Sequence, residues 1–119
     1  MGPEIKYFDN PDEVRTMRFG RGEVVNVGGA EVLRVTLEPG WRWSEHVKPI
    51  AGTDWCEAPH FQYLISGRMH VVMRDGTEFE GEPGSVVIVP PGHDAWVVGD
   101  ETVTAIDWAG AHVWAKPQD

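Results

Sequence analysis

Turn signals recur at short intervals along this chain, and they limit how long any element between them can be. Turns rich in glycine and proline interrupt the 119 residues at Gly28-Gly29, Pro39-Gly40, Asp75-Gly76, Pro83-Gly84, Pro90-Pro91-Gly92 and Gly99-Asp100. Several segments between them are rich in β-branched and aromatic residues, which favour strands. Roughly nine or ten short strands joined by frequent turns are typical of an all-β barrel or sandwich.

The segment from residue 60 to residue 66 has the clearest strand pattern. Side chains alternate between the two faces of a strand, so His60, Gln62 and Leu64 lie on one face. The apolar side chains of the other face are Phe61, Tyr63 and Ile65. A face that is polar at one end and apolar farther along indicates a barrel wall with a wet mouth.

Other segments have patterns that also predict strands. Alternation within residues 31–37 places Leu33, Val35 and Leu37 on one face. Residues 41–46 carry tryptophans at alternate positions, and residues 112–115 predict a last short strand. Residues 85–89 form a continuous β-branched run, which is typical of a strand buried on both faces.

The sequence predicts one helix, and it lies near the N-terminus. Asn10 is a capping residue, Pro11 lies in the first turn, and two acidic residues stand near the positive end of the helix dipole. We therefore expect about two helical turns over residues 10–18, ended by Gly20.

Charge and cysteine content narrow the classes of function. Lys and Arg total 10 against 19 Asp and Glu, for a net charge of −9, which argues against nucleic-acid and membrane partners. The longest apolar run, Val86 to Val89, is far too short to span a membrane, and the N-terminal residues lack the apolar core of a signal peptide. Cys56 is the only cysteine, so no internal disulfide forms, and we expect a cytoplasmic protein.

The turn framework resembles that of the cupins. Their first motif is a glycine, five residues, a histidine, one residue and a second histidine, with a glutamate later, seven residues before another glycine. Gly40 and His46 match the beginning of this motif, but Lys48 stands where the second histidine would be. His60 occupies the glutamate position, seven residues before Gly67.

The second cupin motif is a glycine, five residues, a proline, any residue, a glycine, two residues and a histidine. Gly84, Pro90 and Gly92 match it. Ala95 occupies the histidine position, while His93 lies two residues earlier and on the same face of an extended chain. The framework therefore matches the family, and the pattern of metal ligands departs from it.

The resemblance covers about residues 31–108, which would form the core barrel of a single cupin domain over residues 1–119. It implies an all-β fold, a double-stranded β-helix or jelly-roll barrel, preceded here by the short helix. It also implies a homodimer and one divalent metal held inside the barrel by three imidazoles and a carboxylate.

Three histidines near turns, His46, His60 and His93, are the candidate metal ligands, and we expect them to converge on one cavity. Their neutral nitrogens suit a transition metal such as Zn, Fe, Ni, Mn or Cu rather than Mg or Ca. Gln62 or Cys56 would supply a further ligand. The simpler alternative is that these histidines line the mouth of the barrel without a metal.

Three candidate ligand-binding residues accompany the histidines. Lys48 would pair with an anion, and Trp43 and Trp96 would line a pocket for a planar or apolar small molecule. Three functions stay open from the sequence: a metal-binding barrel with dioxygenase, isomerase or lyase chemistry on a small organic acid or aromatic, a metal-free binding or sensor module, and a non-catalytic assembly barrel. No catalytic residue is assigned at this level.

Overall fold

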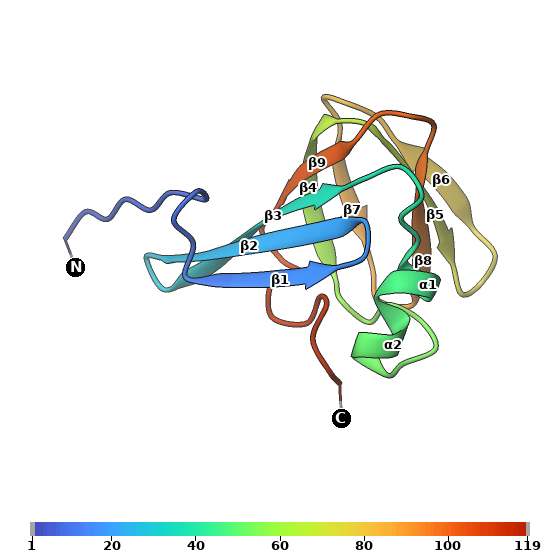
Figure 1. Cartoon of the computed structure of the whole chain (residues 1–119), viewed down its shortest axis with the longest axis horizontal. Helices are drawn as coiled ribbons and strands as arrows, with labels where there is room; N and C mark the ends of the chain where they lie inside the picture. The colour runs from blue at the N-terminus through green and yellow to red at the C-terminus, as the bar shows by residue number, and fades with distance from the viewer. Residues whose placement is uncertain (1, 119) are drawn as a thin grey trace.

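A computed structural model describes residues 2–118, and its strands form two antiparallel β-sheets (Figure 1). The larger sheet has the strand order β1-β2-β3-β9-β4-β7, and the smaller has the order β6-β5-β8. In sequence order, the strands are β1 (Glu13–Met17), β2 (Gly20–Val27), β3 (Ala30–Leu37), β4 (His60–Ser66), β5 (Arg68–Met73), β6 (Glu78–Gly81), β7 (Val86–Val89), β8 (His93–Val98) and β9 (Val103–Asp107).

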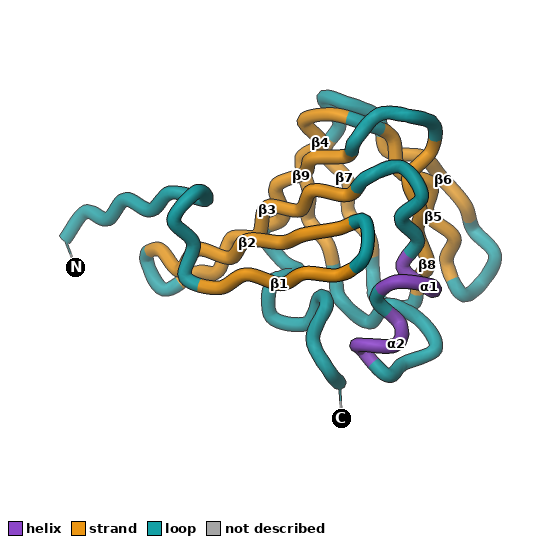
Figure 2. The backbone as a smooth tube through the Cα atoms, in the orientation of Figure 1, coloured by secondary structure: helices purple, strands orange, loops and turns teal. Residues whose placement is uncertain are grey.

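Two one-turn helices, α1 (Trp43–His46) and α2 (Lys48–Ala51), lie together at one end of the barrel, with α1 against β8 (Figure 2). Within the described residues, no helix is long and apolar enough to cross a membrane.

The hydrophobic core lies between the two sheets and follows the alternation that the sequence predicts. Leu33, Val35 and Leu37 of β3 are all buried, and Leu64 of β4, two strands away across β9, belongs to the same core. Burying such side chains contributes roughly 1.5–3 kcal/mol each, so this interior accounts for much of the stability of the fold. The all-β jelly-roll prediction is confirmed.

The prediction of an N-terminal helix over residues 10–18 is wrong, because residues 13–17 form the strand β1. This strand pairs antiparallel with β2, with Val14 opposite Glu23 and Met17 opposite Gly20. A helix of two turns is marginal on its own, whereas the free edge of β2 offers a ladder of backbone hydrogen bonds. Arg15 then turns inward and donates from Nη1 to the carbonyl of Trp114 at 2.6 Å.

Three strand predictions also need correction. Residues 43–46 form α1 rather than a strand, and residues 111–115 form turns. Residues 86–89 do form a strand, but β7 is the edge of its sheet, and its burial alternates: Val89 is buried, while Val86 and Ile88 are exposed. The local β-branched pattern therefore identified a strand but could not show which of its faces is covered.

Candidate functional site

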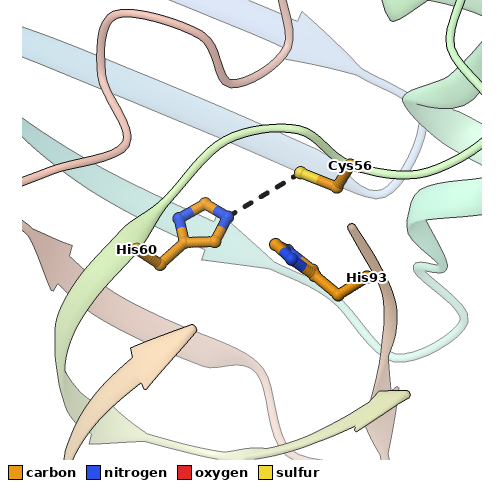
Figure 3. Close-up of side chains that lie close together, drawn as sticks. All are labelled: Cys56, His60 and His93. Atoms are coloured by element: carbon orange, nitrogen blue, oxygen red, sulfur yellow. Dashed lines mark hydrogen bonds between the residues drawn. The ribbon is translucent and has the colours of Figure 1, made fainter. Parts of the chain in front are cut away.

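Cys56, His60 and His93 point toward one another inside the barrel, and each comes from a different segment (Figure 3). His60 and His93 are the first residues of β4 and β8, and Cys56 lies in the loop after α2. Their candidate ligand atoms all lie within 4.8 Å of one another, and all three residues are buried. This group is able to hold a metal ion.

Backbone hydrogen bonds fix Cys56 beside His93. The amide of Cys56 donates to the carbonyl of His93 at 2.8 Å, and the amide of Gly92 donates to the carbonyl of Cys56 at 2.7 Å. The loop that carries the thiol is thus fastened to the start of β8, because Pro90-Pro91-Gly92 turns the chain just before this bridge.

His60 is oriented by Asp107, the last residue of β9. The imidazole Nδ1 lies 2.5 Å from Oδ2 of Asp107, and because a carboxylate accepts, Nδ1 carries the proton. Nε2 then faces Sγ of Cys56 at 3.8 Å and carries the proton shared with the thiol, which a bound metal would displace. Gly110 is required here, since a Cβ at that position would clash with the Asp107 carboxylate and the ring of His60.

Asp107 has no exposed surface and is fully engaged by donors. Besides His60, it accepts from the side-chain amide of Gln62 at 3.1 Å. The backbone amides that donate to its Oδ1, at 3.0 to 3.2 Å, belong to Phe61, Ala109 and Gly110. A buried carboxylate with this many donors stays ionised and holds the imidazole in one orientation.

His93 is fixed in the same tautomer by a different partner. Its Nδ1 lies 2.9 Å from the carbonyl oxygen of Pro90, which only accepts, so Nδ1 is the donor and Nε2 is free. The rings of His60 and His93 are 5.1 Å apart in an edge-to-face arrangement. Two imidazoles thus each have a bound Nδ1 and an available Nε2, as metal-ligating histidines usually do.

The electrostatics of the cluster favour a charged thiol. Burial alone would raise the pKa of Cys56, but hydrogen bonds with His60 and His93 outweigh it and lower the pKa to about 6. Burial would lower the pKa of His60, but Asp107 and Cys56 raise it to about 9. Burial alone would raise the pKa of Asp107, but the hydrogen bond and charge of His60, together with the hydrogen bonds from Ala109 and Gln62, outweigh it and lower the pKa. A thiolate is the form in which cysteine binds metals and attacks electrophiles.

Cys56, His60 and His93 form part of the wall of an apolar cavity of about 40 Å³. Gln62 and Trp43 line it together with the cluster, and the aliphatic side chains of both sheets form most of the remaining wall. No lysine, arginine or carboxylate is among the described residues that line it. A volume of this size holds a few water molecules or a ligand of a few atoms.

The structure does not bring all the predicted site residues together. His46 is part of α1 and is not in the cluster: its Nδ1 lies 3.0 Å from the backbone nitrogen of Arg42, and its ring contacts Phe19. The expected convergence of three histidines is therefore wrong, because residues 43–46 turn as a helix instead of running on as a strand.

The predicted ligand-binding residues divide in the same way. Trp43 lines the cavity, as expected. Lys48 is half exposed on α2, with Nζ 3.7 Å from Asp54, outside the cavity. Trp96 lies on the outer face of β8, stacked against His70 and beneath the guanidinium of Arg42. These two positions do not line the cavity.

Asp107 is the site residue that the sequence reasoning missed. A signal for it exists, because alternation along β9 places Asp107 on the same inward face as Val103 and Ala105. A carboxylate on an otherwise apolar inner face requires a partner, and that requirement points to a nearby histidine.

No family model and no curated protein matches this chain. Among solved structures, a cupin-like protein of Thermotoga maritima is 19% identical with a TM-score of 0.54, over 79% of this chain and 71% of that one. The chain has the cupin fold.

Two enzymes share this barrel. An oxalate decarboxylase mutant of Bacillus subtilis is 17% identical with a TM-score of 0.60, over 93% of this chain but only 31% of that enzyme. A structure from a set of DMSP lyases is 18% identical with a TM-score of 0.53, over 77% of this chain and 48% of that one. At these identities the likeness establishes the cupin architecture alone, so the activity of the present chain rests on its own residues.

Proposed function

We propose that this cupin barrel binds one divalent transition-metal ion through Sγ of Cys56 and Nε2 of His60 and His93. The observation that carries the proposal is that two imidazoles, each with Nδ1 bound to an acceptor, present Nε2 to one buried thiol. One sulfur and two nitrogen ligands favour Zn, Fe, Ni or Cu over Mn, because thiolates prefer softer metals.

The spacing of the three donors supports this ligand set. Tetrahedral zinc with typical bond lengths holds a sulfur and a nitrogen ligand about 3.6 Å apart. Sγ of Cys56 and Nε2 of His60 are 3.8 Å apart, and no pair of ligand atoms in the group exceeds 4.8 Å. Small side-chain rotations therefore suffice to bring all three donors to bonding distance.

Three protein ligands leave a coordination position for a small molecule, and such a metal would supply Lewis-acid chemistry to it. The protein contributes a mostly apolar wall and one amide, that of Gln62, beside the donors. Because the cavity is about 40 Å³, we propose a ligand of a few heavy atoms. An aromatic ring of the kind considered from the sequence would require the walls to move.

Metal titration of the purified protein tests this proposal. After chelation, we expect one equivalent of Zn²⁺ or Co²⁺ to bind, with a thiolate-to-cobalt absorption band in the Co²⁺ form. Cys56→Ser should abolish that band, and His93→Gln should weaken binding at least about 100-fold. His46→Gln is the matched control and should bind as the wild type does. Full binding in Cys56→Ser, or loss of binding in His46→Gln, would overturn the assignment.

A second candidate function rests on the same atoms without a metal. Cys56, His60 and Asp107 are arranged as a nucleophile, a base and an orienting carboxylate, with separations of 3.8 Å and 2.5 Å. This is the geometry that activates a catalytic thiol. Alkylation of Cys56 by iodoacetamide separates the candidates: protection by one equivalent of Zn²⁺ supports the metal site, and unchanged fast alkylation supports the nucleophile.

Lys48 and Trp96 do not support the sensor function that the sequence left open, since neither lines the cavity. We further propose a reducing compartment such as the cytoplasm, because a lone thiol that acts as a ligand or nucleophile has to stay reduced. The homodimer implied by the cupin resemblance is also a proposal, and the exposed apolar side chains of β4 and β7 offer a surface for it: Phe61, Tyr63, Ile65, Val86 and Ile88.

A further inference from the structure

The chain after β9 crosses the end of the barrel that holds the candidate site. His60 and His93 begin β4 and β8, and Asp107 ends β9, so the site lies at the ends of these strands. Residues 108–118, called the C-terminal segment below, run in turns outside both sheets and reach α2 (Figure 1). Within this segment, Trp114 is the residue that lines the cavity.

Hydrogen bonds fix the C-terminal segment at both of its ends. At the start, Oδ1 of Asp107 accepts from the backbone amides of Ala109 and Gly110, each at 3.0 Å. At the other end, the amide of Gln118 donates to the carbonyl of Ala51 in α2 at 2.9 Å. The segment therefore spans the barrel end from β9 to α2, and it begins on the carboxylate of the candidate site.

The inner face of the larger sheet leaves a space for the indole ring of Trp114. Gly22 of β2 is paired with Val35 of β3, whose side chain is buried in the barrel, so a side chain at position 22 would point the same way. A Cβ there would lie only 2.7 Å from Cζ3 of Trp114 and 3.0 Å from Cδ1 of Leu33. The glycine therefore makes room for the ring, and Trp114 is buried.

Arg15 fixes the backbone of Trp114 from the same row of the sheet. Arg15 of β1 is the other partner of Gly22, and its Nη1 donates to the carbonyl of Trp114 at 2.6 Å. Nε and Nη2 of the same guanidinium donate to Glu13, so the buried charge is paired. One contact to the ring and one to the carbonyl thus hold Trp114 in the wall of the cavity.

Trp114 differs from the rest of the cavity wall in how its position is determined. Most of the other lining residues belong to strands, so the pairing of the sheets fixes where they lie. Trp114 belongs to no strand, so its size can change without a change in strand pairing. With the indole in place the cavity is about 40 Å³, whereas a protein cavity that binds benzene has roughly 150 Å³. The indole therefore occupies space that a bound ring would need.

We infer that Trp114 sets the size limit of the candidate site: it restricts the site to acyclic ligands of a few heavy atoms and excludes a benzene-sized ring. The inference rests on the proposed function, because it concerns which molecules reach Cys56 and its two histidines. It applies to the metal site and to the catalytic thiol alike, since both would use Cys56 in the same cavity.

The reaction of Cys56 with thiol reagents of two sizes tests the inference in metal-free protein. Cys56 is the only cysteine of the chain, so all labelling reports on the cavity. Iodoacetamide is small and acyclic, whereas N-phenylmaleimide carries a benzene ring, and each rate is divided by the rate of the same reagent with glutathione. Trp114→Ala should raise the rate with N-phenylmaleimide at least about tenfold more than the rate with iodoacetamide, because the size of a pocket discriminates between ligands by such factors.

Trp108→Ala is the matched control: it removes the same ring from a half-exposed position of the same segment and should leave both rates unchanged. Circular dichroism establishes that each variant is folded, and Trp114→Leu replaces Trp114→Ala if the latter does not fold. Equal acceleration of both reagents, unchanged rates, or the same selective acceleration in Trp108→Ala overturns the inference. Because no metal is present, failure of metal uptake would count against the proposed metal site and leave this result unaffected.

Discussion

Strands β3 and β4 flank β9 in the same sheet, yet they distribute their side chains in opposite ways. β3 follows the ordinary pattern, with leucines and a valine inside and Arg34 and Thr36 outside. β4 begins with His60 and Gln62 on its inner face, and the side chains on its outer face, Phe61, Tyr63 and Ile65, are all apolar and exposed.

The difference shows where this protein gives up stability for other purposes. A buried polar group costs free energy unless it has a hydrogen-bond partner, and an exposed apolar side chain does not contribute the free energy of burial. Departures from the pattern of apolar side chains inside and polar side chains outside are expected at functional surfaces. On β4, the inner departure is the candidate site, and the outer departure is the row of exposed side chains Phe61, Tyr63 and Ile65.

The largest effect is expected where the inner polar face of β4 depends on a single partner. Asp107→Ala leaves the Nδ1–H of His60 and several buried amides without an acceptor, so the free energy of unfolding should fall by about 3–5 kcal/mol. Urea denaturation measures it. Asp107→Asn retains an acceptor oxygen and should lose less. A loss below about 1 kcal/mol would show that the polar face of β4 is independent of Asp107.

A slightly smaller loss is expected on the ordinary strand. Leu33 of β3 has no exposed surface, so Leu33→Ala removes apolar contacts and leaves a cavity, at a cost of about 3 kcal/mol. The same denaturation experiment checks it. Val32→Ala, at a half-buried position on the outer side of β3, is the control and should cost less than about 1 kcal/mol.

The side chains on the outer face of β4 should contribute little to the stability of the monomer. Ile65 is about half exposed, so Ile65→Thr should change the free energy of unfolding by no more than about 0.5 kcal/mol at dilutions where the chain is monomeric. At high concentration the same variant should lose stability relative to the wild type, because dimerisation adds to stability by mass action. A large loss at every concentration would place Ile65 in the core of the monomer instead.

The smallest effect on stability is expected for His70, on the smaller sheet, whose outer face is polar as usual. The pKa of His70 is raised above 6.5, because its hydrogen bonds to Glu78, at 2.8 Å, and to Glu80 outweigh the effect of partial burial. A raised pKa means that the folded state binds the proton more tightly, so this contribution is complete below pH 6.5 and is lost as the pH rises through the folded pKa.

We expect the effect of His70 to amount to a few tenths of a kcal/mol, measured as the difference in unfolding free energy between acidic and alkaline pH. His70→Gln should flatten this part of the pH profile. An unchanged profile in the variant would assign the pH dependence to other groups.

Much of the fold could be predicted from local patterns, because turns and alternation are local properties. The strand at residues 60–66 has the predicted bounds and faces, and residues 31–37 lie within β3 with the predicted inward side chains. The errors at residues 13–17 and 43–46 have one cause. Short segments have weak preferences of their own, so the edge of β2 and the packing of Trp43 in the core decided their structure.

The candidate site was predictable in part. His60, His93 and the optional ligand Cys56 do converge, while His46 does not. Alternation gave the inward direction of His60, but which segments meet depends on pairings between residues far apart in the chain. The bridge between Cys56 and His93, and the hydrogen bond from His60 to Asp107 across β4 and β9, are such pairings.

By itself, the sequence determined that this chain forms short strands, where most of them begin and end, and which face of β4 carries its histidine. Only the tertiary structure decided that a thiol and two imidazoles meet in place of three imidazoles, and that the outer side chains of β4 stay exposed. The physical reason is that side-chain direction follows from the local backbone, whereas proximity and burial follow from how distant strands pair.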